Sequence, residues 1–76
     1  MKDNVKGARN FVYNSINCAI KHKDLNSIGY YNGEVDITQG INFAYIADSY
    51  GLTVNQYERL IDYGQKLAEK RVNEIL

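Results

Sequence analysis

The stretch FAYIADSYGLTVNQYERLID, residues 43–62, marks where one helix ends and a longer one begins. Gly51 can take the left-handed backbone conformation that commonly ends a helix, because it has no β-carbon to clash. Thr53 and Gln56 then have the T-x-x-Q spacing of a capping box, in which two residues satisfy each other's backbone N–H groups. Since the stop and start signals are so close together, the sequence predicts two helices joined by a tight turn.

The small and apolar residues of this stretch also follow a pattern, formed by Ile46, Ala47, Gly51, Leu52, Tyr57 and Leu60. Their spacing resembles the helix-turn-helix, a motif that places its second helix in the major groove of DNA. The resemblance covers about twenty residues and implies that Asn55, Gln56 and Arg59 contact base edges. It also implies that Thr53 lies near a phosphate. A helical hairpin that binds no DNA has the same signals, so the stretch leaves two interpretations open.

Before this stretch, residues 3–22 have the periodicity of an amphipathic helix. Apolar side chains recur at intervals of three and four residues, at Val5, Ala8, Val12, Ile16, Ala19 and Ile20. Asp3 or Asn4 can cap this helix. The opposite face is rich in asparagine and lysine, which favours a solvated surface. We expect Cys18, also on this helix, to be a buried and unreactive thiol.

A short β-hairpin is predicted between the first and second helices. Tyr30 and Tyr31 lead into Asn32 and Gly33, a dipeptide that suits a type I′ turn, and residues 34–37 then alternate as a strand does. A two-stranded hairpin is marginal on its own, so we expect this one to pack on the helices.

The second helix is predicted to run from about Thr38 to Tyr50, and the third from Thr53 to about Glu74. A chain of 76 residues is expected to form one domain. The predicted fold class is mainly α: a three-helix domain with a small β-hairpin between helix 1 and helix 2. Helices 2 and 3 are arranged as a helix-turn-helix or a helical hairpin.

The outer part of the third helix, from Lys66 on, extends beyond what the other two predicted helices can cover. Its apolar stripe continues there through Leu67, Ala68, Val72 and Ile75. Gly64 would permit another backbone to approach closely. These features favour a homodimer through the C-terminal helix, in the manner of a coiled coil.

Charge is distributed unevenly, although the net charge is zero. Residues 1–23 contain five basic residues and one acidic residue, a balance of +4. Residues 24–50 contain four acidic residues and no lysine or arginine, a balance of −4, whereas residues 51–76 are balanced. A nucleic-acid-binding protein normally has a clear basic excess, because phosphate contacts supply most of its affinity. The pattern favours attraction between the two charged segments, within one chain or between protomers.

The residue types needed for catalysis or metal binding do not form a recognisable group. His22 is the only histidine, and it lies at the predicted end of the first helix, where a cation is favourable. No glycine-rich phosphate loop occurs. We therefore expect no enzyme activity, no metal and no cofactor. No stretch has a signal-peptide pattern or the ~20 apolar residues of a membrane span, so we expect a soluble, cytoplasmic protein without membrane contact.

Two functions remain, protein binding and DNA binding, and the hairpin favours protein binding. Tyrosines at a loop tip offer a large contact area at low entropic cost. The candidate protein-binding residues are Tyr30, Tyr31, Glu34 and Asp36. We expect an adaptor or inhibitor that docks on another protein through this acidic hairpin and the long C-terminal helix, of the kind that phages and mobile elements encode. The alternative is a DNA-binding regulator that uses helix 53–74 as its recognition helix.

Overall fold

The computed structural model describes residues 4–76, in which the chain forms three α-helices and a two-stranded antiparallel hairpin. The helices are α1 (Asn4–His22), α2 (Phe43–Tyr50) and α3 (Val54–Ile75). The hairpin between α1 and α2 consists of β1 (Tyr30–Tyr31) and β2 (Glu34–Val35), flanked by the 3-10 helices η1 (Leu25–Ile28) and η2 (Ile37–Gln39). The predicted fold class is confirmed. Of the two predicted caps of α1, Asp3 lies outside the described residues.

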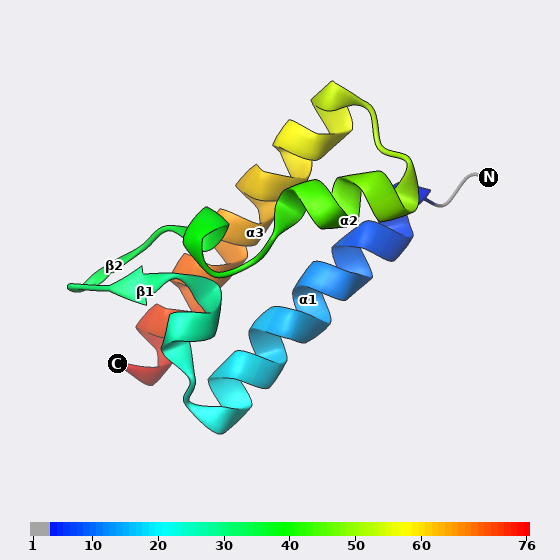
Figure 1. Ribbon diagram of the computed structural model, residues 1–76. Coiled ribbons are helices and arrows are strands. Elements are labelled where there is room, and N and C mark those ends of the chain that lie inside the picture. The colour runs from blue at the N-terminus through cyan, green and yellow to red at the C-terminus, as the bar shows by residue number, and fades with distance from the viewer. Residues whose placement is uncertain (1–3) are drawn as a thin grey trace.

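α1 and α3 lie side by side and run in the same direction, while α2 crosses one side of the pair (Figure 1). Two contacts show the parallel direction, because the later residue of α1 meets the later residue of α3. Arg9 lies over the ring of Tyr63, and Arg71 donates a hydrogen bond to Asn17. Because the pair is parallel, the connecting segment must return the chain along the length of α1 before α3 can begin. None of the helices in residues 4–76 combines the length and the apolar character needed to cross a bilayer.

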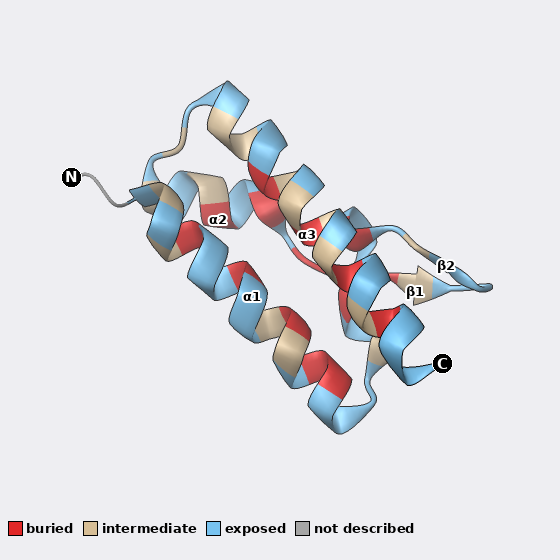
Figure 2. Ribbon diagram, turned by 180° about the vertical axis from the view of Figure 1, so that it is seen from behind, coloured by how far each residue is buried: buried red, intermediate tan, exposed pale blue. Residues whose placement is uncertain are grey.

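The core lies between the long helices and the segment that connects them. Figure 2 shows its residues as stripes along α1 and α3. The buried apolar side chains are Ala8, Val12, Ile16, Ala19, Ile20, Ile28, Ile37, Ile41, Phe43, Ile46, Leu60, Ala68 and Val72. No polar or charged side chain of residues 4–76 is buried. The hydrophobic effect, at roughly 25 cal/mol per Å² of apolar surface removed from water, is therefore the main stabilising term.

The turn between α2 and α3 has the predicted geometry. Gly51 has a φ of +65°, and the N–H of Leu52 donates to the carbonyl of Ala47 at 2.9 Å, as in a Schellman C-cap. The N–H of Thr53 donates to Gln56 Oε1 at 2.9 Å, and the N–H of Gln56 donates to Thr53 Oγ1 at 3.2 Å. The capping box is therefore complete, and local signals were sufficient to locate both helix ends.

The second helix begins later than predicted, at Phe43 instead of Thr38. Asp36 caps only the 3-10 turn η2, and the chain then passes through Gly40. The backbone of Gly40 runs so close to that of Gly29 that a β-carbon would collide with it. This close approach bends the chain, and a new N-cap just before Phe43 then starts α2.

The outer part of α3 is covered within the chain as far as Val72, whereas Ile75 at the end of the stripe is 44% exposed. A β-carbon on Gly64 would lie 3.0 Å from Phe43 Cζ and 3.2 Å from Val12 Cγ1, so the glycine allows close packing inside this chain. Ala68 and Val72 are also buried. Most of the stripe is therefore satisfied within the chain, and the homodimer stays a prediction.

The hairpin contains the predicted type I′ turn. Both central residues have positive φ angles, 54° for Asn32 and 84° for Gly33, and Tyr30 pairs with Val35 across the ladder. The tip of the hairpin extends away from the helices in both views (Figures 1 and 2). Its base packs on the core through half-buried Tyr30 and Val35.

A glutamine on α3 holds the base of the hairpin. Gln65 Oε1 accepts a hydrogen bond from the N–H of Ile37 at 2.9 Å, and Gln65 Nε2 donates to the carbonyl of Val35 at 2.6 Å. An edge strand leaves such backbone groups unpaired, and burying them without a partner is costly. The side chain of Gln65 therefore joins α3 to the segment that leads into η2.

We predict that Gln65→Ala lowers the free energy of unfolding by about 1–3 kcal/mol, because it leaves a partly buried backbone N–H without an acceptor. Urea denaturation measures the change, and hydrogen exchange should be faster at the Ile37 amide. Asn73→Ala, an exposed amide truncation on the same helix, should change stability by no more than about 0.5 kcal/mol. Equal losses in the two variants would show that Gln65 does not hold the hairpin.

Candidate functional site

The solvent-facing surface of α3 is divided lengthwise by charge. One line of side chains, here called the acidic row, is Glu58, Asp62 and Glu69, with Gln65 among them. The adjacent line, here called the basic row, is Arg59, Lys66 and Lys70, with Tyr63 among them. Each line has the i, i+4, i+7, i+11 spacing that keeps side chains on one strip of a helix.

The uncharged members show which way each row faces. Gln65 bonds to the hairpin backbone, so the acidic row lies toward the hairpin. Tyr63 lies under the guanidinium of Arg9, with Arg9 Cζ 5.6 Å from the ring centroid, so the basic row lies toward α1. Asp62 and Lys66 form an ion pair at 3.1 Å that links the two rows. α3 thus carries its opposite charges on two neighbouring lines, one toward the hairpin and one toward α1.

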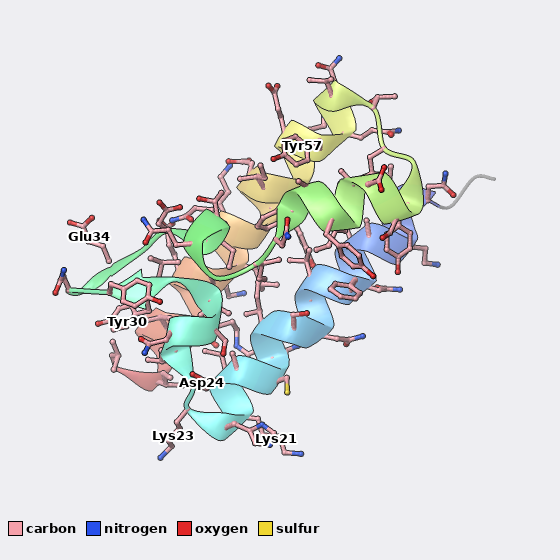
Figure 3. The ribbon with its side chains drawn as sticks, in the orientation of Figure 1. Lys21, Lys23, Asp24, Tyr30, Glu34 and Tyr57 are labelled. Carbon is pink, nitrogen blue, oxygen red and sulfur yellow. The ribbon has the colours of Figure 1, made fainter. Side chains whose placement is uncertain are left out.

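Two of the four predicted protein-binding residues line a groove between the hairpin and the C-terminal end of α3. Tyr30 and Glu34 come from the hairpin, where Figure 3 shows them, and Glu69 comes from the acidic row. The groove has a volume of about 400 Å³, and its other lining residues are Gly33, Val35, Val72, Asn73 and Leu76. It combines two carboxylates with an aromatic ring and apolar side chains, and is called the hairpin groove below.

The other two predicted residues lie outside the hairpin groove. Tyr31 is 45% exposed and pairs with Glu34, so it extends the same surface. The carboxylate of Asp36 accepts hydrogen bonds from Thr38 Oγ1 at 2.7 Å, from Gln39 Nε2 at 3.1 Å and from the N–H of Thr38 at 3.2 Å. These donors, first the hydroxyl of Thr38 and then the amide of Gln39, lower the pKa of Asp36 below its ordinary value of 3.8. Asp36 is therefore a structural cap of η2.

We predict that an NMR titration places the pKa of Asp36 below 3.8, and that Thr38→Val raises it toward that value. Because the folded-state pKa is the lower one, the stabilisation by this carboxylate is complete above the unfolded-state pKa. It is lost as the pH falls through the folded-state pKa. Thr38→Ser keeps the hydroxyl and should keep the low pKa. If the pKa of Asp36 were unchanged in Thr38→Val, the Thr38 hydroxyl would not be the main cause of the lowered pKa.

The four residues that the helix-turn-helix resemblance assigns to DNA have different surroundings in the structure. The side-chain oxygens of Thr53 and Gln56 serve the capping box. Asn55 is exposed on the first turn of α3. Arg59 is also exposed, and with Gln56 and Arg9 it lines a small cavity of about 100 Å³. The DNA-binding interpretation stays a prediction.

We predict that Thr53→Ala lowers the free energy of unfolding by about 1 kcal/mol, because it removes the acceptor for the first N–H groups of α3. Thr53→Ser keeps that acceptor and should retain nearly all of the stability. Urea denaturation of the two variants measures the difference. If both variants matched the wild type, the capping box would contribute nothing measurable.

Two residues that matter here were missed in the sequence. Gln65 was not recognised as a hairpin anchor, and Arg9 was considered only as part of the charge of residues 1–23. In the sequence of α3, each residue of the basic row directly follows a residue of the acidic row. This pattern could have predicted a helix surface divided into an acidic and a basic line. The approach of Arg9 to Arg59 joins two helices, so no local pattern contains it.

The prediction that Cys18 is buried is wrong, because its side chain is exposed. The buried stripe of α1 uses the next position, Ala19, instead. His22 Nδ1 lies 3.0 Å from the carbonyl oxygen of Cys18 and 3.7 Å from its sulfur. Both side chains line a shallow groove of about 670 Å³ with Phe11. Within residues 4–76, no three histidine, cysteine, aspartate or glutamate side chains are grouped so that they could hold a metal ion.

Comparisons of this chain with protein-family models, with curated proteins and with solved structures gave no match. Its function is therefore inferred from the geometry and charge of its own residues.

Proposed function

We propose that this chain is a small protein-binding module, without enzyme activity, that docks in the cytoplasm on a basic surface of a partner protein. The docking surface is the hairpin groove, with Tyr31 and the acidic row beside it. One observation carries the proposal: Glu34 of the hairpin, Glu69 of α3 and Tyr30 line one groove, where the hairpin meets α3. An adaptor could use such a face, and so could an inhibitor that occupies a nucleic-acid-binding surface.

The groove carboxylates form no ion pair with any other residue of the described part of the chain. Within residues 4–76, neither Glu34 nor Glu69 has a lysine, arginine or histidine nitrogen within 4.0 Å. Gln65 Nε2 donates to Glu69 Oε2 at 2.8 Å, which orients this carboxylate but leaves its charge unneutralised. A lysine or arginine of a partner would form charge-assisted hydrogen bonds here, roughly twice as strong as neutral ones.

The surface is also held in place before a partner arrives. Gln65 fixes the base of the hairpin to α3, and the type I′ turn fixes its tip. Less conformational freedom is then lost on binding, so more of the contact energy contributes to affinity. Tyr31 adds an exposed ring on this rigid support, and tyrosine is enriched among the residues that dominate interface energies.

We predict that Glu34→Lys and Tyr31→Ala each weaken partner binding roughly tenfold or more, while helical circular dichroism is unchanged. The partner is captured with the wild-type protein from a lysate of the source organism and identified by mass spectrometry. Its affinity for each purified variant is then measured by calorimetry at several salt concentrations. Affinity should fall as salt rises, because exposed charge pairs are screened.

Two control variants make the same kinds of substitution on α2, outside the groove. Asp48→Lys makes the same charge reversal on α2, and Tyr45→Ala removes a ring that is 63% exposed on α2. Both should bind like the wild type. The proposal fails if these controls lose as much affinity as the groove variants, or if the groove variants bind normally.

A further inference from the structure

The side of the α1–α3 pair that α2 does not cross has a basic surface. Figure 2 views this side, on which no other element of residues 4–76 lies. Its members at helical spacing, here called the basic strip, are Lys6, Arg9 and Tyr13 of α1 with Arg59, Tyr63, Lys66 and Lys70 of α3. The contact of Arg9 with Tyr63 places the two halves of the strip side by side.

Most cations of the strip have no carboxylate partner. In residues 4–76 the ion pairs are Lys66 with Asp62 and Arg71 with Glu74, both at 3.1 Å. Lys6, Arg9, Arg59 and Lys70 are therefore left with uncompensated charge among the described residues. Asp62, the one carboxylate paired with a cation of the strip among the described residues, neutralises Lys66 alone, so the strip keeps a positive balance.

Two arginines converge on one point of the strip. Arg9 from α1 and Arg59 from α3 line the same cavity of about 100 Å³, together with Gln56 and the apolar residues Val5, Leu52 and Leu60. The guanidinium of Arg9 lies over the ring of Tyr63, at the surface beside this cavity. The planar fork of arginine matches the oxygens of a phosphate. A phosphate bound at this surface would face arginines of both helices.

Aromatic side chains lie along the same strip. Tyr13 follows Arg9 by one helical turn and is 45% exposed, and Tyr63 lies half-buried under Arg9. Cations that alternate with accessible rings suit single-stranded nucleic acid, whose phosphates pair with the cations while its bases stack on the rings. From Arg59 to Lys70 the strip is about 16 Å long, enough to follow a short segment of strand.

The shape of this side disfavours a duplex. An α-helix enters the major groove only if it projects from the protein. α1 flanks α3 from Tyr63 to Arg71, so over this part the two helices together form a broad surface in place of one projecting ridge. The carboxylates of the acidic row would also face the phosphates of a duplex that wrapped around α3. A single strand can follow the strip and avoid the acidic row.

We propose that the basic strip binds single-stranded nucleic acid, with Arg9 and Arg59 holding one phosphate between α1 and α3 and Tyr13 stacking on a base. This site is distinct from the hairpin groove, which lies on the acidic side. It also differs from recognition by a helix-turn-helix, because it depends on two residues of α1 and requires no base contact by Asn55.

Fluorescence anisotropy with a labelled oligodeoxythymidine of about 15 nucleotides tests the proposal, at about 50 mM and about 200 mM salt. The full chain should bind at low salt and more weakly at high salt. Arg9→Ala and Arg59→Ala should each weaken binding and make the salt slope shallower by about 0.7 for each phosphate that is no longer neutralised. Tyr13→Ala should weaken binding roughly tenfold and leave the salt slope unchanged.

Matched variants and a second ligand complete the experiment. Lys23→Ala removes an exposed cation just beyond α1, outside the strip, and should bind like the wild type. Arg9→Lys keeps the charge but loses the fork, so it should bind more weakly than the wild type while remaining folded. Weaker binding to a duplex of the same length is expected as well.

Several results would overturn the proposal. No binding at low salt would do so, as would binding to the duplex as tight as to the single strand. An equal loss in Lys23→Ala and Arg9→Ala would indicate diffuse attraction without a site. Binding of the chain to itself would appear in sedimentation as a mass that rises with concentration. If the chain self-associates and binds no strand, the ligand of the strip is the acidic side of a second copy.

Discussion

The parallel packing of α1 against α3 is the constraint on which the rest of this fold depends. Gly64 makes it possible, because a side chain there would meet Val12 of α1 and Phe43 of α2. Antiparallel helices can be joined by a loop of a few residues. A parallel pair instead requires the chain to travel back along α1, whose 19 residues span about 28 Å. The hairpin, the two 3-10 helices and α2 together make this return.

The path of this return explains the separation of charge. Residues 24–50 carry four carboxylates and no lysine or arginine, and they lie in the connecting segment, away from the open side of the pair. Along α3 the division continues, because the acidic row faces the hairpin and the basic row faces α1. The +4 and −4 segments were expected to attract each other, within one chain or between protomers. The ion pairs in residues 4–76 instead lie within α3, so the separated charges remain available to ligands.

The sequence predicted the features that depend on contacts between neighbouring residues, and it missed those that depend on residues far apart in the chain. The turn at Gly51 and the hairpin depend on neighbouring residues, and both were predicted correctly. The predicted start of α2 was wrong, because an N-cap residue such as Asp36 can precede either a short 3-10 turn or a long helix. The sequence around Asp36 does not distinguish the two. The contact that decides between them is made by distant backbone. Gln65 and Arg9 were missed for the same reason: each acts on a partner that only the tertiary fold brings near.

The two proposed surfaces select different ligands because their charges are opposite. Phosphates are repelled by the acidic side, and a basic partner is repelled by the strip, so each ligand has one place to bind. On α3, however, the acidic and basic rows are neighbouring lines, and the ion pair of Asp62 with Lys66 joins them. Charges this close are separated by less than a Debye length, which is about 8 Å at physiological salt. A ligand that neutralises one row therefore changes the potential at the other row, so the two proposed sites should influence each other electrostatically.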